Sequence, residues 1–123
     1  MSTKVLVVDD SQMVRLQVGR ALTAAGFVVI EAVDGADAIE KLQENPNTSL
    51  IVCDVNMPRM NGIDFLERKN ELGNGVPVVM LTTEGQPELI KKAKALGAKG
   101  WVMKPFKPES LVAAAKKLTS VAV

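Results

Sequence analysis

The sequence predicts one doubly wound α/β domain, in which helices cover both faces of a five-stranded parallel sheet. Four short apolar runs lack the polar alternation of half-exposed strands, and this is typical of parallel strands buried on both faces. Strand starts are expected near residues 4, 27, 49, 77 and 100, and the spacing of 22 to 28 residues suits a strand followed by a helix. Right-handed crossovers between such units place helices on both sides of the sheet.

Each of the four apolar runs stops at a polar residue. They are residues 5–8 before Asp9 and Asp10, residues 50–53 before Asp54, residues 78–81 before Thr82, and residues 101–103 before Lys104. Because parallel strands point the same way, these polar residues should meet at the carboxyl edge of the sheet, where ligands bind in open α/β folds. Three carboxylates, a hydroxyl and an ammonium at one edge indicate a functional site.

Segments with helical periodicity lie between the strands, and most carry a start or stop signal. The signals are Gly26, Asn45-Pro46 and Gly97 as stops, and Gly62, Pro87 and Pro108 as starts. The apolar stripe of the third helix is expected to extend to Leu72. The stripe of the fourth is interrupted by lysines, which should face solvent: Lys91, Lys92 and Lys94.

Composition narrows the class of protein. The chain has 123 residues, which suits one domain, and its 47% hydrophobic and 24% charged residues are ordinary for a soluble protein. The single cysteine, Cys53, allows no internal disulfide and fits a reducing cytoplasm. The apolar run near the start is too short for a signal peptide or a membrane span. The absence of histidine excludes histidine-based catalysis.

The net charge of +1 hides an uneven distribution. Residues 1–80 carry a balance of −4, whereas residues 81–123 carry +5, and all eight bases in that second segment are lysines. Such a segment is either a solvated helical face or a surface for an acidic protein partner. Nucleic acid is a poorer match, because aromatic residues are scarce there and the domain is not strongly basic overall.

The residues at the strand ends suggest metal and phosphate chemistry. Asp9, Asp10 and Asp54 would repel one another unless a cation compensates, and Mg²⁺ accepts carboxylate oxygens together with phosphate. Lys104 is costly at the end of a central strand unless it faces an anion, so it either neutralises these acids or holds a phosphoryl oxygen. Thr82 either bonds its own backbone or donates to such an oxygen.

These residues also carry a family resemblance over the whole chain. The motifs are Asp9-Asp10-Ser11, Asp54 with Asn56-Met57-Pro58 and then Gly62, Leu81-Thr82-Thr83-Glu84, and Lys104-Pro105-Phe106. In this order and spacing they resemble the receiver domains of two-component response regulators. The resemblance implies a flavodoxin-like sheet of strand order 2-1-3-4-5, which is the order found in chemotaxis receivers. It implies one receiver domain over residues 1–123, with no output domain.

The resemblance assigns a role to each site residue. It implies that Asp54 accepts the phosphoryl group, that Asp9, Asp10, Asp54 and the Asn56 carbonyl hold Mg²⁺, and that Thr82 and Lys104 contact the phosphoryl oxygens. Trp101 takes the place of the aromatic residue that turns from solvent toward the sheet on activation, although that residue is usually tyrosine or phenylalanine. Pro105 is expected to follow a cis peptide bond.

The implied activity is signalling rather than turnover of an external substrate. A cytoplasmic, monomeric phosphoacceptor is expected, which a histidine kinase phosphorylates and which promotes its own dephosphorylation, alone or with a phosphatase. The motifs favour the chemotaxis type, whose docking target is the flagellar motor switch, and no nucleic acid or membrane is expected as a partner. A phosphorelay protein and a cell-cycle or stress regulator remain alternatives within the family.

Two other classes fit the sequence less well. A haloacid-dehalogenase-type phosphatase would place its acids in an Asp-x-Asp pattern after the first strand, whereas Asp9 and Asp10 are adjacent. A flavodoxin would need a phosphate loop after the first strand and aromatic residues beside the flavin, but the chain has no tyrosine and three phenylalanines.

Overall fold

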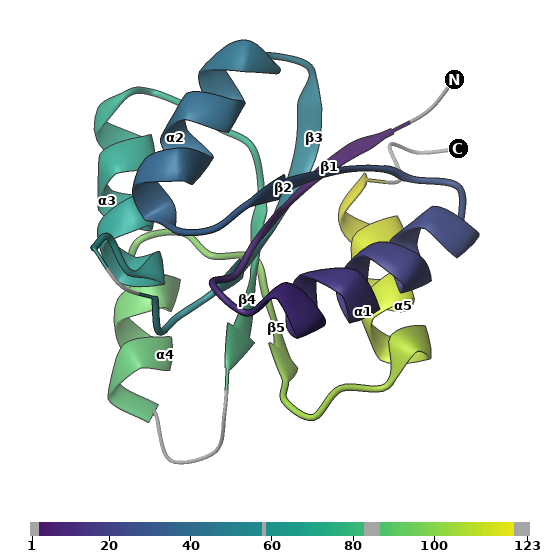
Figure 1. The fold of residues 1–123 in the computed structure, drawn as a ribbon. Helices are drawn as coiled ribbons and strands as arrows, with labels where there is room; N and C mark the ends of the chain where they lie inside the picture. Colours follow the sequence, from purple (N-terminus) through teal and green to yellow (C-terminus); the bar gives the residue numbers. More distant parts are fainter. Residues whose placement is uncertain (1–2, 58, 83–86, 120–123) are drawn as a thin grey trace.

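The computed structural model describes residues 3–57, 59–82 and 87–119 and has the predicted alternation of strands and helices (Figure 1). Its elements in chain order are β1 (Lys4–Val8), α1 (Gln12–Ala24), β2 (Val28–Ala32), α2 (Gly35–Glu44), β3 (Thr48–Asp54), α3 (Gly62–Glu71), β4 (Val78–Thr82), α4 (Pro87–Ala95), β5 (Gly100–Met103) and α5 (Pro108–Thr119). All neighbouring strands pair in parallel, in the order β2-β1-β3-β4-β5. The predicted strand order is confirmed.

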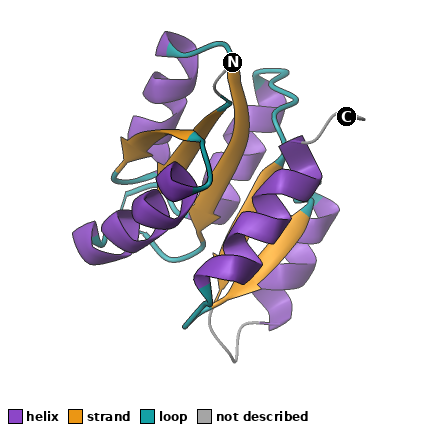
Figure 2. Ribbon diagram, turned by 90° about the vertical axis from the view of Figure 1, so that its right-hand side faces the viewer, coloured by secondary structure: helices purple, strands orange, loops and turns teal. Residues whose placement is uncertain are grey.

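Helices lie on both sides of the sheet (Figure 2), and a hydrophobic cluster fills the space on each side. Successive residues of β1 and β3 alternate between the layers, so that Leu6 and Ile51 pack on one side while Val5 and Leu50 pack on the other. Helices α2, α3 and α4 cover the first side, and α1 and α5 cover the second (Figure 1). The central strands β1, β3 and β4 are thus apolar throughout because both of their faces are buried.

Local signals end and begin the helices where the sequence indicates. Gly26 and Gly97 have positive φ angles of 97° and 94°, which glycine adopts without strain at helix ends. The lysines of α4 at positions 91, 92 and 94 are exposed, as predicted. The prediction that the apolar stripe of α3 extends to Leu72 was wrong, because Leu72 lies beyond the last helical residue and is 45% exposed.

The strand β5 departs from its prediction. It lies at the edge of the sheet, where the predicted strand order places it, so the expectation that both of its faces are buried was wrong: Met103 is 50% exposed. The placement of Lys104 at the end of a central strand was wrong for the same reason. A run of three apolar residues does not distinguish an edge strand from a central one, because the distinction depends on pairing with strands far away in sequence.

Candidate functional site

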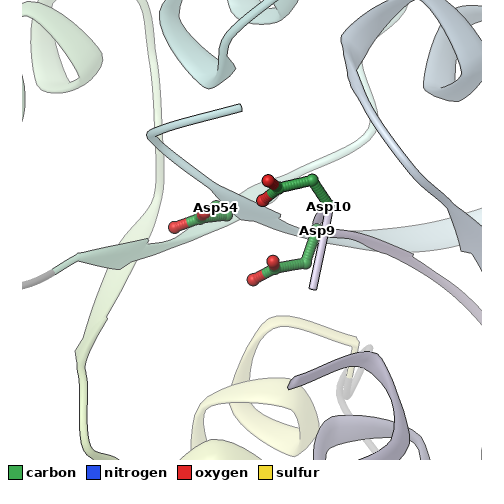
Figure 3. Close-up of side chains that lie close together, drawn as sticks. All are labelled: Asp9, Asp10 and Asp54. Atoms are coloured by element: carbon green, nitrogen blue, oxygen red, sulfur yellow. The ribbon is translucent and has the colours of Figure 1, made fainter. Parts of the chain in front are cut away.

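Three carboxylates meet at the carboxyl edge of the sheet (Figure 3). Asp9 follows β1 directly, Asp10 comes next, and Asp54 is the last residue of β3, which pairs with β1. One oxygen from each carboxylate lies within 4.8 Å of the other two. Asp9 and Asp54 are buried, with 1% and 8% of their surface exposed, whereas Asp10 is exposed. The pairing of two neighbouring strands therefore assembles the cluster.

Lys104 supplies the cation for this cluster. Its Nζ donates to Asp54 Oδ1 at 3.0 Å and to Asp9 Oδ2 at 3.2 Å. Its backbone N–H donates to the Thr82 carbonyl at 2.7 Å, which fixes the chain at the end of β4. The peptide bond that follows, to Pro105, is cis, as the resemblance implied. The lysine thus reaches the acids from the edge strand and lies between the two buried ones.

The electrostatics of the pair show how the ammonium and the acids influence each other. Burial, followed by the charge of Asp9, raises the pKa of Asp54 above its ordinary value, although Lys104 acts in the opposite direction. Burial alone would lower the pKa of Lys104, but the hydrogen bond to Asp54 and the charges of both acids raise it overall. The ammonium stays charged, while the Asp54 carboxylate is held in a site that disfavours its negative charge.

The Asp9 carboxylate is also engaged by the backbone. Its Oδ1 accepts the Ser11 N–H at 2.8 Å, and Ser11 in turn caps α1 by accepting from the Val14 N–H. Arg15 Nη1 donates to the Asp9 carbonyl at 2.6 Å, and Arg15 Nε donates to Glu31 at 2.9 Å. Sequence reasoning missed Arg15. A helical arginine one turn after two acids is common on solvated surfaces and gives no specific signal.

The turn after Asp54 depends on a close backbone approach. A Cβ on Gly62 would lie 2.4 Å from the Asp54 carbonyl oxygen, so only glycine fits there without movement of the chain. The Gly62 N–H donates to the Val55 carbonyl at 2.9 Å. Asn56 lies in this turn and is exposed. Pro58 of the same motif lies outside the described residues.

A second ion pair holds the β3–α3 loop against α2. Arg59 has a φ of 64° and pairs with the buried carboxylate of Asp34, with 2.6 Å between Nε and Oδ2. Asp34 also caps α2 by accepting the Asp37 N–H. The Gly35 N–H donates to the Met60 carbonyl at 3.0 Å. Sequence reasoning missed this pair as well, although Asp34 before Gly35 and Asp37 is a recognisable N-cap pattern.

The two residues implied as the switch are placed on neighbouring strands. Thr82 ends β4 and is 2% exposed, and its Oγ1 has no hydrogen-bond partner among the described residues. Trp101 is half-buried against the layer under α2, α3 and α4, so the expectation of a ring in solvent was wrong. The Trp101 Nε1 is shielded and likewise lacks a partner in the described part of the chain. Thr83 and Glu84 lie outside the described residues.

The donor set fits a hard divalent cation. The cluster offers only carboxylate oxygens, and backbone and water oxygens could complete a shell of the kind that Mg²⁺ takes. Cys53, the residue before Asp54, is fully buried, and burial raises the pKa of its thiol well above its ordinary value. Zinc and copper are therefore poor matches.

Comparisons with known proteins point to one family. The family model of the response regulator receiver domain matches residues 5–116. The chemotaxis protein CheY of Treponema pallidum is 44% identical over 84% of this chain and 73% of its own length, and CheY1 of Helicobacter pylori is 40% identical over 88% of this chain and 90% of its own. The structure of chemotaxis response regulator CheY4 of Vibrio cholerae superimposes with a TM-score of 0.88 at 40% identity, covering 96% of this chain and 99% of that one.

A putative response regulator from Chloroflexus aurantiacus is also similar. It superimposes with a TM-score of 0.91 at 28% identity and covers 98% of this chain and all of that one.

No helix within the described residues has the length and apolar character needed to cross a membrane.

Proposed function

Because the chain belongs to the family of response regulator receiver domains, we propose that it carries a signal as a phosphoryl group on Asp54. A histidine kinase of a chemotaxis system would be the donor, in the cytoplasm. One observation above all supports this proposal: Lys104 bridges two buried acids, so a cationic donor already lies at the carboxylate that would receive the group. The similarity to CheY proteins of 40–44% identity supports the chemotaxis assignment.

The chemistry follows from what each side chain offers. An oxygen of Asp54 attacks the phosphorus of a phosphohistidine, the P–N bond breaks, and the imidazole leaves with the electron pair and takes a proton from solvent. Lys104 moves its hydrogen bonds from Asp54 to a phosphoryl oxygen, and the Thr82 hydroxyl donates to another. Asp9, Asp10, Asp54 and the Asn56 carbonyl would hold Mg²⁺, which would supply charge neutralisation for the oxygens of the transferring group.

The same site lets the signal decay. Water attacks the phosphorus of the aspartyl phosphate, the bond between phosphorus and the Asp54 oxygen breaks, and inorganic phosphate leaves while the carboxylate is restored. The exposed Asp10 lies at the open side of the cluster, where water and a phosphatase could reach it. The protein thus acts as a signalling domain that is both substrate and catalyst of its own dephosphorylation, and it needs no pocket for an external substrate.

Output would pass through the lysine-rich face of α4, β5 and α5. Its exposed lysines include Lys91, Lys92, Lys99 and Lys117. This charge suits an acidic segment of a partner, which for a chemotaxis protein is the flagellar motor switch. Phosphorylation must strengthen partner binding by the same factor by which partner binding favours phosphorylation. The coupling free energy is about 1–3 kcal/mol in typical cases.

The phosphorylation step is tested with acetyl phosphate and Mg²⁺, followed by intact mass spectrometry. The wild-type protein and the Asp64→Asn variant, which changes an exposed aspartate in the first turn of α3, should each gain one phosphoryl group. Asp54→Asn should gain none, and the label should be lost on acid or hydroxylamine treatment. An acid-stable label, or a label that persists in Asp54→Asn, would overturn the assignment.

The output step is tested by titrating the motor-switch protein of the same organism. Affinity should rise on phosphorylation and fall when Lys91 and Lys92 are both changed to glutamine. Trp101 is the single tryptophan, so its emission reports the switch without a label. Equal affinity of the two states for the motor switch would exclude this output and leave phosphoryl transfer to a second histidine protein as the alternative.

A further inference from the structure

A lysine lies where the helical pattern of α3 calls for an apolar residue. Lys69 follows Phe65 by four positions and Leu66 by three, so it shares their inward face. It is only 5% exposed, although lysine is almost never buried without a partner for its charge. The proposed phosphoryl site does not involve it, because α3 runs from the Asp54 turn toward the opposite edge of the sheet (Figure 1).

The Lys69 ammonium is poorly matched by its surroundings. Its Nζ donates to the Asn74 carbonyl at 2.8 Å, while an ammonium carries three donors. None of the ion pairs found among the described residues includes it. Burial and, less strongly, the charge of Lys99 lower its pKa, so an anion would be the partner that this site most lacks.

The backbone around Lys69 is fixed without help from its ammonium. The Asn74 N–H donates to the Lys69 carbonyl at 3.1 Å, and the Gly73 N–H donates to the Asn70 carbonyl at 3.0 Å. Gly73 has a φ of 73°. These bonds form a Schellman motif, in which the residue at the Lys69 position commonly makes an apolar contact. Closing the helix therefore does not account for a charged group here.

A cavity of about 360 Å³ opens beside Lys69, between the ends of α2 and α3 that lie side by side in Figure 1. Its apolar walls come from Ile39, Leu42, Pro46 and Leu72, and Lys69 is its one charged lining residue. The volume is within the range of small-molecule sites, which combine mostly apolar walls with a few polar groups. We propose that this cavity binds a small organic carboxylate, with the carboxylate on Lys69 Nζ and an apolar chain or ring against the walls.

The proposal accounts for both unusual features of the site. A carboxylate would accept from the donors that Asn74 leaves free and would compensate the buried charge with charge-assisted hydrogen bonds. The apolar part of the ligand would cover Leu72, which is 45% exposed without it. A simple anion gains only the hydrogen bonds with the Lys69 ammonium, and a neutral apolar molecule gains only the contact with the apolar walls.

Three probes separate these contributions: octanoate, octan-1-ol and acetate. Each is titrated into ¹⁵N-labelled protein, and amide shifts are followed in ¹H–¹⁵N spectra. Octanoate should shift amides of residues 39–45 and 69–74 with saturation, and octan-1-ol and acetate should each bind at least about tenfold more weakly. Lys69→Met and Lys69→Gln should abolish the preference for octanoate over octan-1-ol. Lys117→Met, on an exposed lysine of α5, should leave it unchanged.

Each outcome decides for or against the site. Equal binding of octanoate and octan-1-ol by the wild-type protein would show that the ammonium does not recognise the ligand. Equal binding of octanoate and acetate would show that the walls do not. Saturating shifts elsewhere in the molecule, or no shifts with octanoate, would overturn the proposal, and so would an unchanged preference in both Lys69 variants. Phosphorylation of Asp54 is measured separately, so neither result depends on the other.

Discussion

Replacing Asp54 with asparagine should stabilise the protein in the absence of metal, although it removes the residue proposed to be essential. Two ionised carboxylates no more than 4.8 Å apart repel by at least about 3.5 kcal/mol at an effective dielectric constant of about 20. Burial of the Asp54 carboxylate costs several kcal/mol more. Against these terms, its attraction to Lys104 at 3.0 Å is worth about 5.5 kcal/mol on the same scale.

The balance of these terms favours the variant by about 2 kcal/mol at neutral pH. Lys104 keeps its bond to Asp9 after the substitution, so the ammonium is not left unpaired. The direction agrees with the raised pKa of Asp54, whose first cause is burial and whose second is the charge of Asp9. A group with a pKa raised by folding favours the folded state while it is protonated and loses that contribution as the pH rises through the raised value.

The assay is urea denaturation with EDTA present, followed by circular dichroism at several pH values. Asp54→Asn should match the wild-type protein near pH 4, exceed it increasingly as the pH rises through the raised pKa of Asp54, and keep a constant advantage at higher pH. Added Mg²⁺ should stabilise the wild-type protein more than the variant and narrow the difference. Asp64→Asn is the matched control and should change stability by less than about 0.5 kcal/mol at each pH. A less stable variant at neutral pH, or a difference that does not vary with pH, would refute this reasoning.

Three further substitutions test the frame around the cluster. Lys104→Met should destabilise the protein by about 3 kcal/mol in urea denaturation and abolish phosphorylation, because two buried acids lose their cation. The control Lys117→Met should change neither the stability nor the phosphorylation. Gly62→Ala should lower the free energy of unfolding by about 2 kcal/mol, since its Cβ would overlap the carbonyl at the end of β3. Gly75→Ala, where a Cβ meets open space, should change it by less than about 0.5 kcal/mol. Asp10→Ala should lower Mg²⁺ affinity in calorimetric titration without lowering stability in EDTA, and unchanged affinity would exclude Asp10 as a ligand.

Much of the fold could be predicted because its signals are local. Continuous apolar runs, glycines after helices and prolines in first turns placed the strands and helices, and the shared direction of parallel strands then brought Asp9, Asp54 and Lys104 together. The edge position of β5 was predicted from the strand order that the family resemblance implied, and its own residues do not indicate it. An edge strand pairs with a neighbour on one side only, and a run as short as residues 101–103 does not indicate on how many sides it pairs.

The missed residues of the site act through contacts that join distant segments. The pair between Arg59 and Asp34 spans 25 positions, and neither residue belongs to an apolar pattern that would mark it. Arg15 cannot be told from an ordinary helical arginine in the sequence, and only the fold shows that it donates to the Asp9 carbonyl. Lys69 could have been noticed as a break in the stripe of α3, but its burial depends on how closely α2 packs there.

Thr82 and Trp101 illustrate how the resting structure prepares the proposed switch. Trp101 pairs in register with Met80, and Thr82 lies two residues beyond Met80, so all three side chains leave the same face of the sheet. Both Thr82 Oγ1 and Trp101 Nε1 are buried donors without partners in the described chain, and each such donor costs about 1–3 kcal/mol. A phosphoryl oxygen on Asp54 would give the Thr82 hydroxyl the acceptor it lacks. Under the proposed switch, a shift of Thr82 toward that oxygen would change the space beside the tryptophan ring, so phosphorylation would favour one position of Trp101 without any new contact to the ring itself.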